Sequence, residues 1–107
     1  MLFKSPRGTK DILPPEIILW QQVEQKARDV FSLYGFDEIR TPVLEESKLF
    51  SRSLGDLTDI VQKQMFVIKK ETDTFVLRPE ATASIIRSYV ENTLYNFNSV
   101  AKFYYIG

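Results

Sequence analysis

The corner formed by residues 77–83, Leu-Arg-Pro-Glu-Ala-Thr-Ala, constrains the fold of this chain more than any other stretch. It follows a β-prone run at 74–77 and precedes a helical pattern that extends from Glu80 to about Tyr95. Pro79 disfavours helix for the residue before it and suits a first helical turn. The sequence therefore predicts a strand that ends as a helix begins, with Glu80 and Thr82 in the first turn.

This corner has two interpretations. A first helical turn has unpaired backbone N–H groups and a positive dipole, so an acidic residue and a hydroxyl stabilise it without any ligand. Alternatively, the Glu80 carboxylate and the Thr82 hydroxyl form a polar pocket that binds a small ligand carrying an ammonium group. The corner alone favours the first interpretation.

Periodicity predicts the remaining elements. Apolar residues spaced by three and four predict an amphipathic helix from Pro15 to Tyr34, ended by Gly35 and covered by a sheet or a partner. Pro42 lies inside the β pattern 36–44, so that strand is at an edge, bulged or ended there, as a subunit contact or as an ordinary protected edge. Further patterns predict a helix at 47–54, a hairpin of strands 64–69 and 74–77, and a strand at 100–106. We expect an α+β fold with an antiparallel sheet flanked by helices.

Composition excludes several classes of function. The 107 residues contain no cysteine and no histidine, so disulfides, thiolate or imidazole metal sites and imidazole catalysis are excluded within them. The formal net charge is zero, and no apolar run approaches membrane-spanning length. We expect a protein of the reducing cytoplasm that does not enter membranes. An apolar strand at a chain end is an aggregation hazard, so we also expect the chain to be a fragment of a longer polypeptide.

Several stretches form an ordered series of motifs that spans essentially the whole chain. They are Arg7-Gly8-Thr9-Lys10-Asp11-Ile12-Leu13-Pro14, Tyr34-Gly35-Phe36-Asp37-Glu38-Ile39-Arg40-Thr41-Pro42, a block with Gly55, Thr58-Asp59-Ile60-Val61, Lys63 and Met65, the corner at 77–83, and Tyr105-Ile106-Gly107. This series resembles the start of a class II aminoacyl-tRNA synthetase catalytic domain, and specifically the histidyl-tRNA synthetase family.

This resemblance implies a site. Glu80, Ala81 and Thr82 would bind substrate histidine, with Glu80 and Thr82 holding its α-ammonium group. The family usually has glycine where this chain has Ala81, and a position that required positive φ would strain alanine. Arg40 and Pro42 would lie in a homodimer interface. Residues 1–107 would be the N-terminal part of the catalytic domain, truncated before the ATP-binding arginine of the second motif, so they contain no catalytic residue or metal ligand and are expected to be inactive alone.

The implied reaction is the ATP- and Mg²⁺-dependent activation of histidine to histidyl-adenylate, followed by transfer to tRNA(His) in the cytoplasm. One alternative is the histidine-binding regulatory subunit of ATP phosphoribosyltransferase, a non-catalytic paralogue of the same fold. Another is a dimerisation fragment formed by the helix 15–34 and the strand that carries Pro42.

Overall fold

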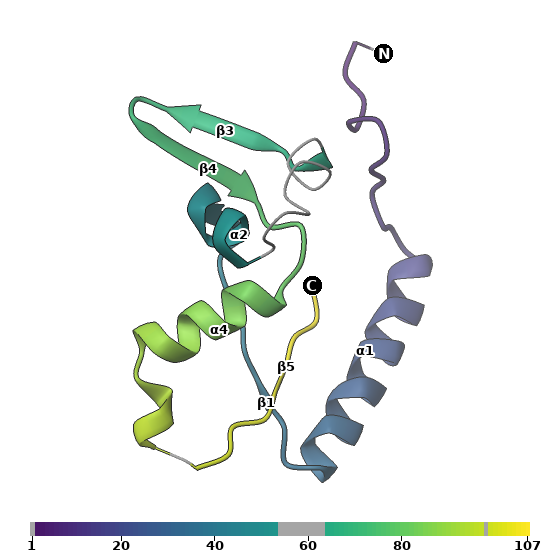
Figure 1. The fold of residues 1–107 in the computed structure, drawn as a ribbon. Coiled ribbons are helices and arrows are strands. Elements are labelled where there is room, and N and C mark those ends of the chain that lie inside the picture. Colours follow the sequence, from purple (N-terminus) through teal and green to yellow (C-terminus); the bar gives the residue numbers. More distant parts are fainter. Residues whose placement is uncertain (1, 54–63, 98) are drawn as a thin grey trace.

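The chain forms helices and short strands in two separate sheets. A computed structural model describes residues 2–53, 64–97 and 99–107 (Figure 1). In chain order the elements are α1 (Glu16–Leu33), β1 (Asp37–Glu38), β2 (Leu44–Glu46), α2 (Ser47–Ser53), β3 (Val67–Lys70), β4 (Asp73–Leu77), α4 (Thr82–Glu91), the 3₁₀ helix η2 (Leu94–Asn96) and β5 (Phe103–Tyr104).

The larger sheet is antiparallel and has the order β2-β4-β3. Strand β4 pairs with β3 through a tight turn and with β2 in the register Glu45 to Val76. Helices α2 and α4 contact each other, and α2 also contacts β2 and β4 (Figure 1). The predicted α+β class, with helices beside an antiparallel sheet, is confirmed.

The prediction of a single strand over 36–44 is wrong. β1 pairs in parallel with β5 in a second sheet, whereas β2 belongs to the larger one. Pro42 lies between them, where its missing N–H would interrupt a ladder. Neither strand includes Pro42, and both β1 and β2 lie at sheet edges, so two of the three outcomes that proline allowed, an edge and an end, are observed.

Two other predicted elements are shorter in the structure. The helix that follows the corner begins at Thr82 and ends at Glu91. Thr93 then adopts the left-handed conformation, with φ of 50°, which an α-helix cannot continue through. The strand predicted at 100–106 pairs only over Phe103 and Tyr104, because its partner β1 offers two residues.

Helix α1 ends as its sequence predicts. Gly35 has φ of +75°, its N–H donates to the Ser32 carbonyl, and the N–H of Phe36 donates to the Phe31 carbonyl. These two bonds form a Schellman cap. The Phe31 ring also stacks on Tyr104 of β5, with centroids 4.5 Å apart, which joins the end of α1 to the small sheet.

Most of α1 stands apart from the sheets (Figure 1), and Arg28 alone of its described ion pairs reaches β1, with Nη2 3.9 Å from Glu38 Oε1. No residue of this helix is buried, and the predicted apolar face is exposed at Trp20, Val23 and Val30. The expected covering surface is therefore not supplied by the described residues. The radius of gyration is 17.2 Å, compared with about 13 Å for a compact domain of this length, which reflects the same open arrangement.

Candidate functional site

The corner places the Glu80 carboxylate over the first turn of α4. Glu80 lies outside the helix, and its Oε2 accepts the Thr82 backbone N–H at 2.6 Å while its Oε1 accepts the Ala83 N–H at 3.1 Å. The carboxylate thus satisfies two N–H groups that the helix leaves unpaired. A carboxylate has about four acceptor positions. Both oxygens therefore retain capacity to accept from a ligand.

Ala81 fits its position without backbone strain. Its φ is −107° and its ψ is −17°, so the left-handed conformation that would require glycine is not used. The side chain is buried, with 5% of the residue exposed. Alanine in place of the usual glycine therefore adds a buried methyl group and does not distort the corner.

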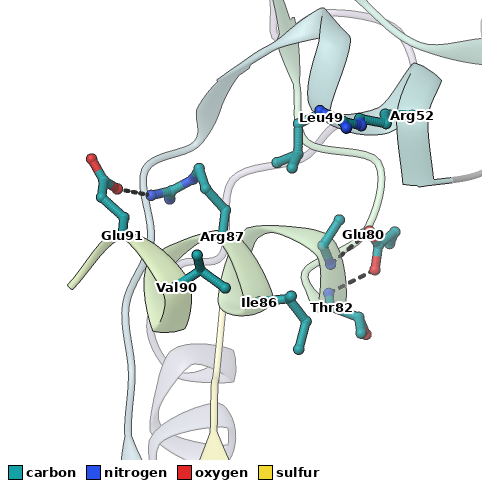
Figure 2. A pocket seen from close by; sticks show the side chains of 9 residues that line it. Leu49, Arg52, Glu80, Thr82, Ile86, Arg87, Val90 and Glu91 are labelled. Atoms are coloured by element: carbon teal, nitrogen blue, oxygen red, sulfur yellow. Dashed lines mark hydrogen bonds and ion pairs between the residues drawn. The ribbon is translucent and has the colours of Figure 1, made fainter. Parts of the chain in front are cut away.

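Glu80 and Thr82 line an open groove of about 910 Å³ between α2 and α4. Figure 2 shows Leu49 and Arg52 on the α2 side and the remaining side chains on the corner and α4. The lining residues are mostly apolar along the middle and charged at the ends: Leu49, Arg52, Glu80, Thr82, Ala83, Ile86, Arg87, Val90 and Glu91. The groove can hold a small molecule with an apolar body whose cationic group meets Glu80.

Arg87 lies at the end of this groove opposite Glu80 (Figure 2), where it forms hydrogen bonds with the carboxylates of Glu45 and Glu91. Its Nε donates to both oxygens of Glu45, at 3.2 and 3.0 Å, and its Nη2 donates to Glu45 Oε1 at 2.8 Å. Its Nη1 donates to Glu91 at 2.6 Å, an i, i+4 pair on α4. These hydrogen bonds, led by those to Glu45, raise the pKa of Arg87 above its ordinary value, so the guanidinium stays charged.

The predicted interface residues lie elsewhere. Arg40 is exposed, and its Nε donates to Glu38 at 3.2 Å. Pro42 is also exposed and lines a second groove, of about 450 Å³, that shares Leu49, Arg87 and Glu91 with the first. The structure therefore brings Glu80, Ala81 and Thr82 together and does not bring Arg40 to them.

Sequence reasoning missed the pairing of Arg87 with Glu45. The two residues are 42 positions apart, and Glu45 is adjacent to Glu46, which has the same side chain. Only the register of β2 distinguishes them, because it buries Glu45 and exposes Glu46. The block Thr58-Asp59-Ile60-Val61 lies outside the described residues.

Two features are absent from the described ranges. Residues 2–53, 64–97 and 99–107 contain no group of three or more acidic side chains placed to hold a metal ion. In the same ranges, no helix has the length and apolarity needed to cross a membrane.

Known proteins resemble this chain along its whole length. The sequence model described as histidyl-tRNA synthetase matches residues 8–107. A protein of Geobacter sulfurreducens named histidine–tRNA ligase is 54% identical over 102 residues, which cover 94% of this chain and 25% of that protein. A Geobacillus sp. protein of the same name is 51% identical over 109 residues, covering 100% of this chain and 26% of its own length. The chain thus spans about a quarter of the length of these relatives.

Solved structures show the same likeness. The crystal structure of apo S. aureus histidyl-tRNA synthetase superposes with a TM-score of 0.82 at 37% identity, over 97% of this chain and 24% of that one. A Bacillus halodurans protein described as an ATP phosphoribosyltransferase regulatory subunit/histidyl-tRNA synthetase gives a TM-score of 0.78 at 27% identity, over 98% and 27%. The sequence model matches residues 8–107, and the relatives and the superposed structure support the same assignment. The chain therefore belongs to the histidyl-tRNA synthetase family.

Proposed function

We propose that this chain supplies the amino-acid-binding corner of a histidine–tRNA ligase. The observation that carries the proposal is the Glu80 carboxylate, which is fixed at the mouth of a groove in a member of the histidyl-tRNA synthetase family. Relatives that share about half of their residues with this chain carry the name histidine–tRNA ligase, which supports the same reaction here.

In this proposal Glu80 accepts hydrogen bonds from the α-ammonium group of histidine. Its oxygens are already directed by the Thr82 and Ala83 N–H groups, so little side-chain freedom remains to be lost when the ligand binds. The Thr82 hydroxyl adds a directional hydrogen bond to the same group. Ala81 joins the two residues and keeps the corner packed. A charge-assisted bond of this kind contributes about 1.5–3 kcal/mol.

The corner would orient histidine for two successive transfers. First, an oxygen of the histidine carboxylate attacks the α-phosphorus of ATP, the bond to the bridging oxygen breaks, and pyrophosphate leaves. Second, a ribose hydroxyl at the 3′ end of tRNA(His) attacks the carbonyl carbon, and AMP leaves. Within this chain, Glu80 and Thr82 hold the amino end still while the carboxylate end reacts. No residue of the chain is assigned a catalytic role.

ATP and Mg²⁺ are required by the proposed reaction, and Mg²⁺ would neutralise phosphate charge. The described residues do not offer an acidic cluster that fits the metal, so no step is assigned to it here. We further propose a cytoplasmic homodimer whose interface includes Arg40 and Pro42. Both residues are exposed, which leaves them free to meet a second subunit.

The test is ATP–pyrophosphate exchange by the complete gene product, measured with and without histidine. Exchange that requires histidine supports the proposal. Glu80→Ala should then abolish it. Glu80→Gln removes the negative charge but keeps a carbonyl oxygen that can accept from the helix N–H groups. If both variants lose exchange, the loss of activity is due to the missing carboxylate charge. Wild-type activity in both variants would overturn the role of Glu80.

The regulatory paralogue is the competing outcome of the same experiment. It would bind histidine without activating it, so calorimetry would detect histidine binding while exchange stayed absent. That pair of results would replace the ligase proposal with the regulatory one.

A further inference from the structure

Two arginines attach the corner to one short segment of the chain that precedes α2. Arg78 stands at the start of the corner, and its Nη1 donates to the Thr41 carbonyl at 3.1 Å and to Thr41 Oγ1 at 2.9 Å. Its backbone N–H donates to the Val43 carbonyl at 2.9 Å. Arg87 stands beyond the corner on α4 and binds Glu45 through three hydrogen bonds. Both attachments therefore end within residues 41–45.

The carboxylate of Glu45 is buried, unlike the other ion-paired carboxylates in the described ranges. Glu45 is 7% exposed, whereas the side chains of Glu16 and Glu24, which pair with Lys10 and Arg28, are 48% and 36% exposed; the Arg87 side chain is half-buried. An exposed pair contributes little because water and salt screen it, but a buried charge that loses its partner is strongly unfavourable. Glu45 and Arg87 are therefore held together in a fixed geometry.

This geometry constrains Glu80 from both sides. Glu45 lies on β2 in register with Val76 of β4, one residue before the strand ends. Strand β4 leads directly into the corner, and Arg87 holds the helix that leaves it against β2. The strand before Glu80 and the helix after it are thus attached to the same strand. A rotation of α4 would move the Thr82 and Ala83 N–H groups that direct the Glu80 carboxylate.

We infer that Glu45 and Arg87 are positioning residues that set the Glu80 carboxylate for the ammonium group of the amino-acid substrate. The inference rests on the proposed function, because it assigns these residues to the histidine site. Neither residue needs to contact the ligand. Their effect acts through the orientation of α4 and so should change histidine binding while leaving the binding of ATP unaffected.

The experiment uses the complete gene product with the variants Glu45→Gln, Arg87→Lys and the double variant. Glu45→Gln keeps the shape and one carbonyl acceptor, and Arg87→Lys keeps the charge but loses the bidentate geometry. Glu24→Gln is the matched control, because it removes one of the two carboxylates that lie 3.9 Å from Arg28 on α1, an arginine about as exposed as Arg87 but outside the groove. Pyrophosphate exchange gives kcat and the KM values for histidine and for ATP, and calorimetry gives the Kd for histidine.

We expect each single variant to raise the histidine KM and Kd by about 10- to 100-fold, with the ATP KM within twofold of wild type. The double variant should lose little more than the worse single variant, because both changes break one interaction. If the single variants fold and their histidine KM is unchanged, the inference is overturned. The proposed function would still stand in that case, provided that the wild type catalyses histidine-dependent exchange. Equal increases in the histidine and ATP KM values would also overturn it, since they indicate general loosening.

If Arg87→Lys does not fold, Thr41→Val gives a second test at the other attachment. It removes the Oγ1 acceptor of Arg78 and keeps the Thr41 carbonyl. A smaller rise in the histidine KM, again without a change for ATP, is expected. No rise in this variant, together with none in Glu45→Gln, would overturn the inference.

Discussion

Replacing Ala81 by glycine tests whether the corner needs the residue that the family usually carries. Two properties of Ala81 decide the outcome. Its φ of −107° is accessible to alanine, so glycine relieves no backbone strain. Its methyl group is buried, so glycine leaves a small void at the corner. We therefore expect Ala81→Gly to destabilise the protein and to leave histidine activation unchanged.

The magnitude follows from two contributions. Removing a buried methyl group costs about 0.8 kcal/mol of apolar burial. Glycine also gives the unfolded chain more conformations to lose on folding, which costs about 0.4–1 kcal/mol. Because Ala81 is only 5% exposed, the burial contribution applies nearly in full, and the chain-entropy contribution does not depend on exposure. The expected loss in the free energy of unfolding is about 1–2 kcal/mol.

Urea denaturation of the complete gene product measures this loss as a lower midpoint, and pyrophosphate exchange measures the histidine KM. We expect the midpoint to fall and the KM to stay within twofold. A higher midpoint would show that alanine is strained at this position. A several-fold lower histidine KM would show that the methyl group obstructs the ligand. Either result would refute the reasoning from the φ angle and the burial of Ala81.

Two further predictions concern stability and assembly. Ser84 Oγ is buried and has no hydrogen-bond partner within the described residues, so Ser84→Ala should raise the free energy of unfolding by about 1 kcal/mol, measured as a higher urea midpoint. A lower midpoint would reveal a partner for the hydroxyl. The complete gene product should sediment as a dimer at micromolar concentration, and Arg40→Glu should shift it toward monomer; a wild-type monomer would contradict the assigned interface.

Sequence patterns predicted the features that depend on neighbouring residues. Gly35 adopts the positive φ expected of a residue that ends a helix, and Pro42, which lacks an N–H, lies outside both β1 and β2. The corner at 77–83 joins β4 to α4 as Pro79 requires. Each of these outcomes follows from backbone chemistry within a few residues. These features can therefore be predicted from the sequence without knowledge of the tertiary structure.

The features that were not predicted depend on residues far apart in sequence. The pattern at 36–44 predicted one continuous strand. In the structure its first part, β1, pairs with β5 and its last part, β2, pairs with β4 in the other sheet. Likewise, nothing local separates Glu45 from Glu46; the pairing with β4 turns one inward to Arg87 and the other outward.

Glu80 shows how the two kinds of information combine. Its residue type and its place after Pro79 predicted a carboxylate at a helix start. Only the structure shows that the carboxylate lies outside the helix, directed by two N–H groups, on a corner that Arg78 and Arg87 attach to the same segment. A carboxylate that merely stabilised its helix would need no such attachments. The hydrogen bonds between buried Glu45 and Arg87 therefore hold the helix whose Thr82 and Ala83 N–H groups direct Glu80, which is the geometry that the proposed histidine site would require.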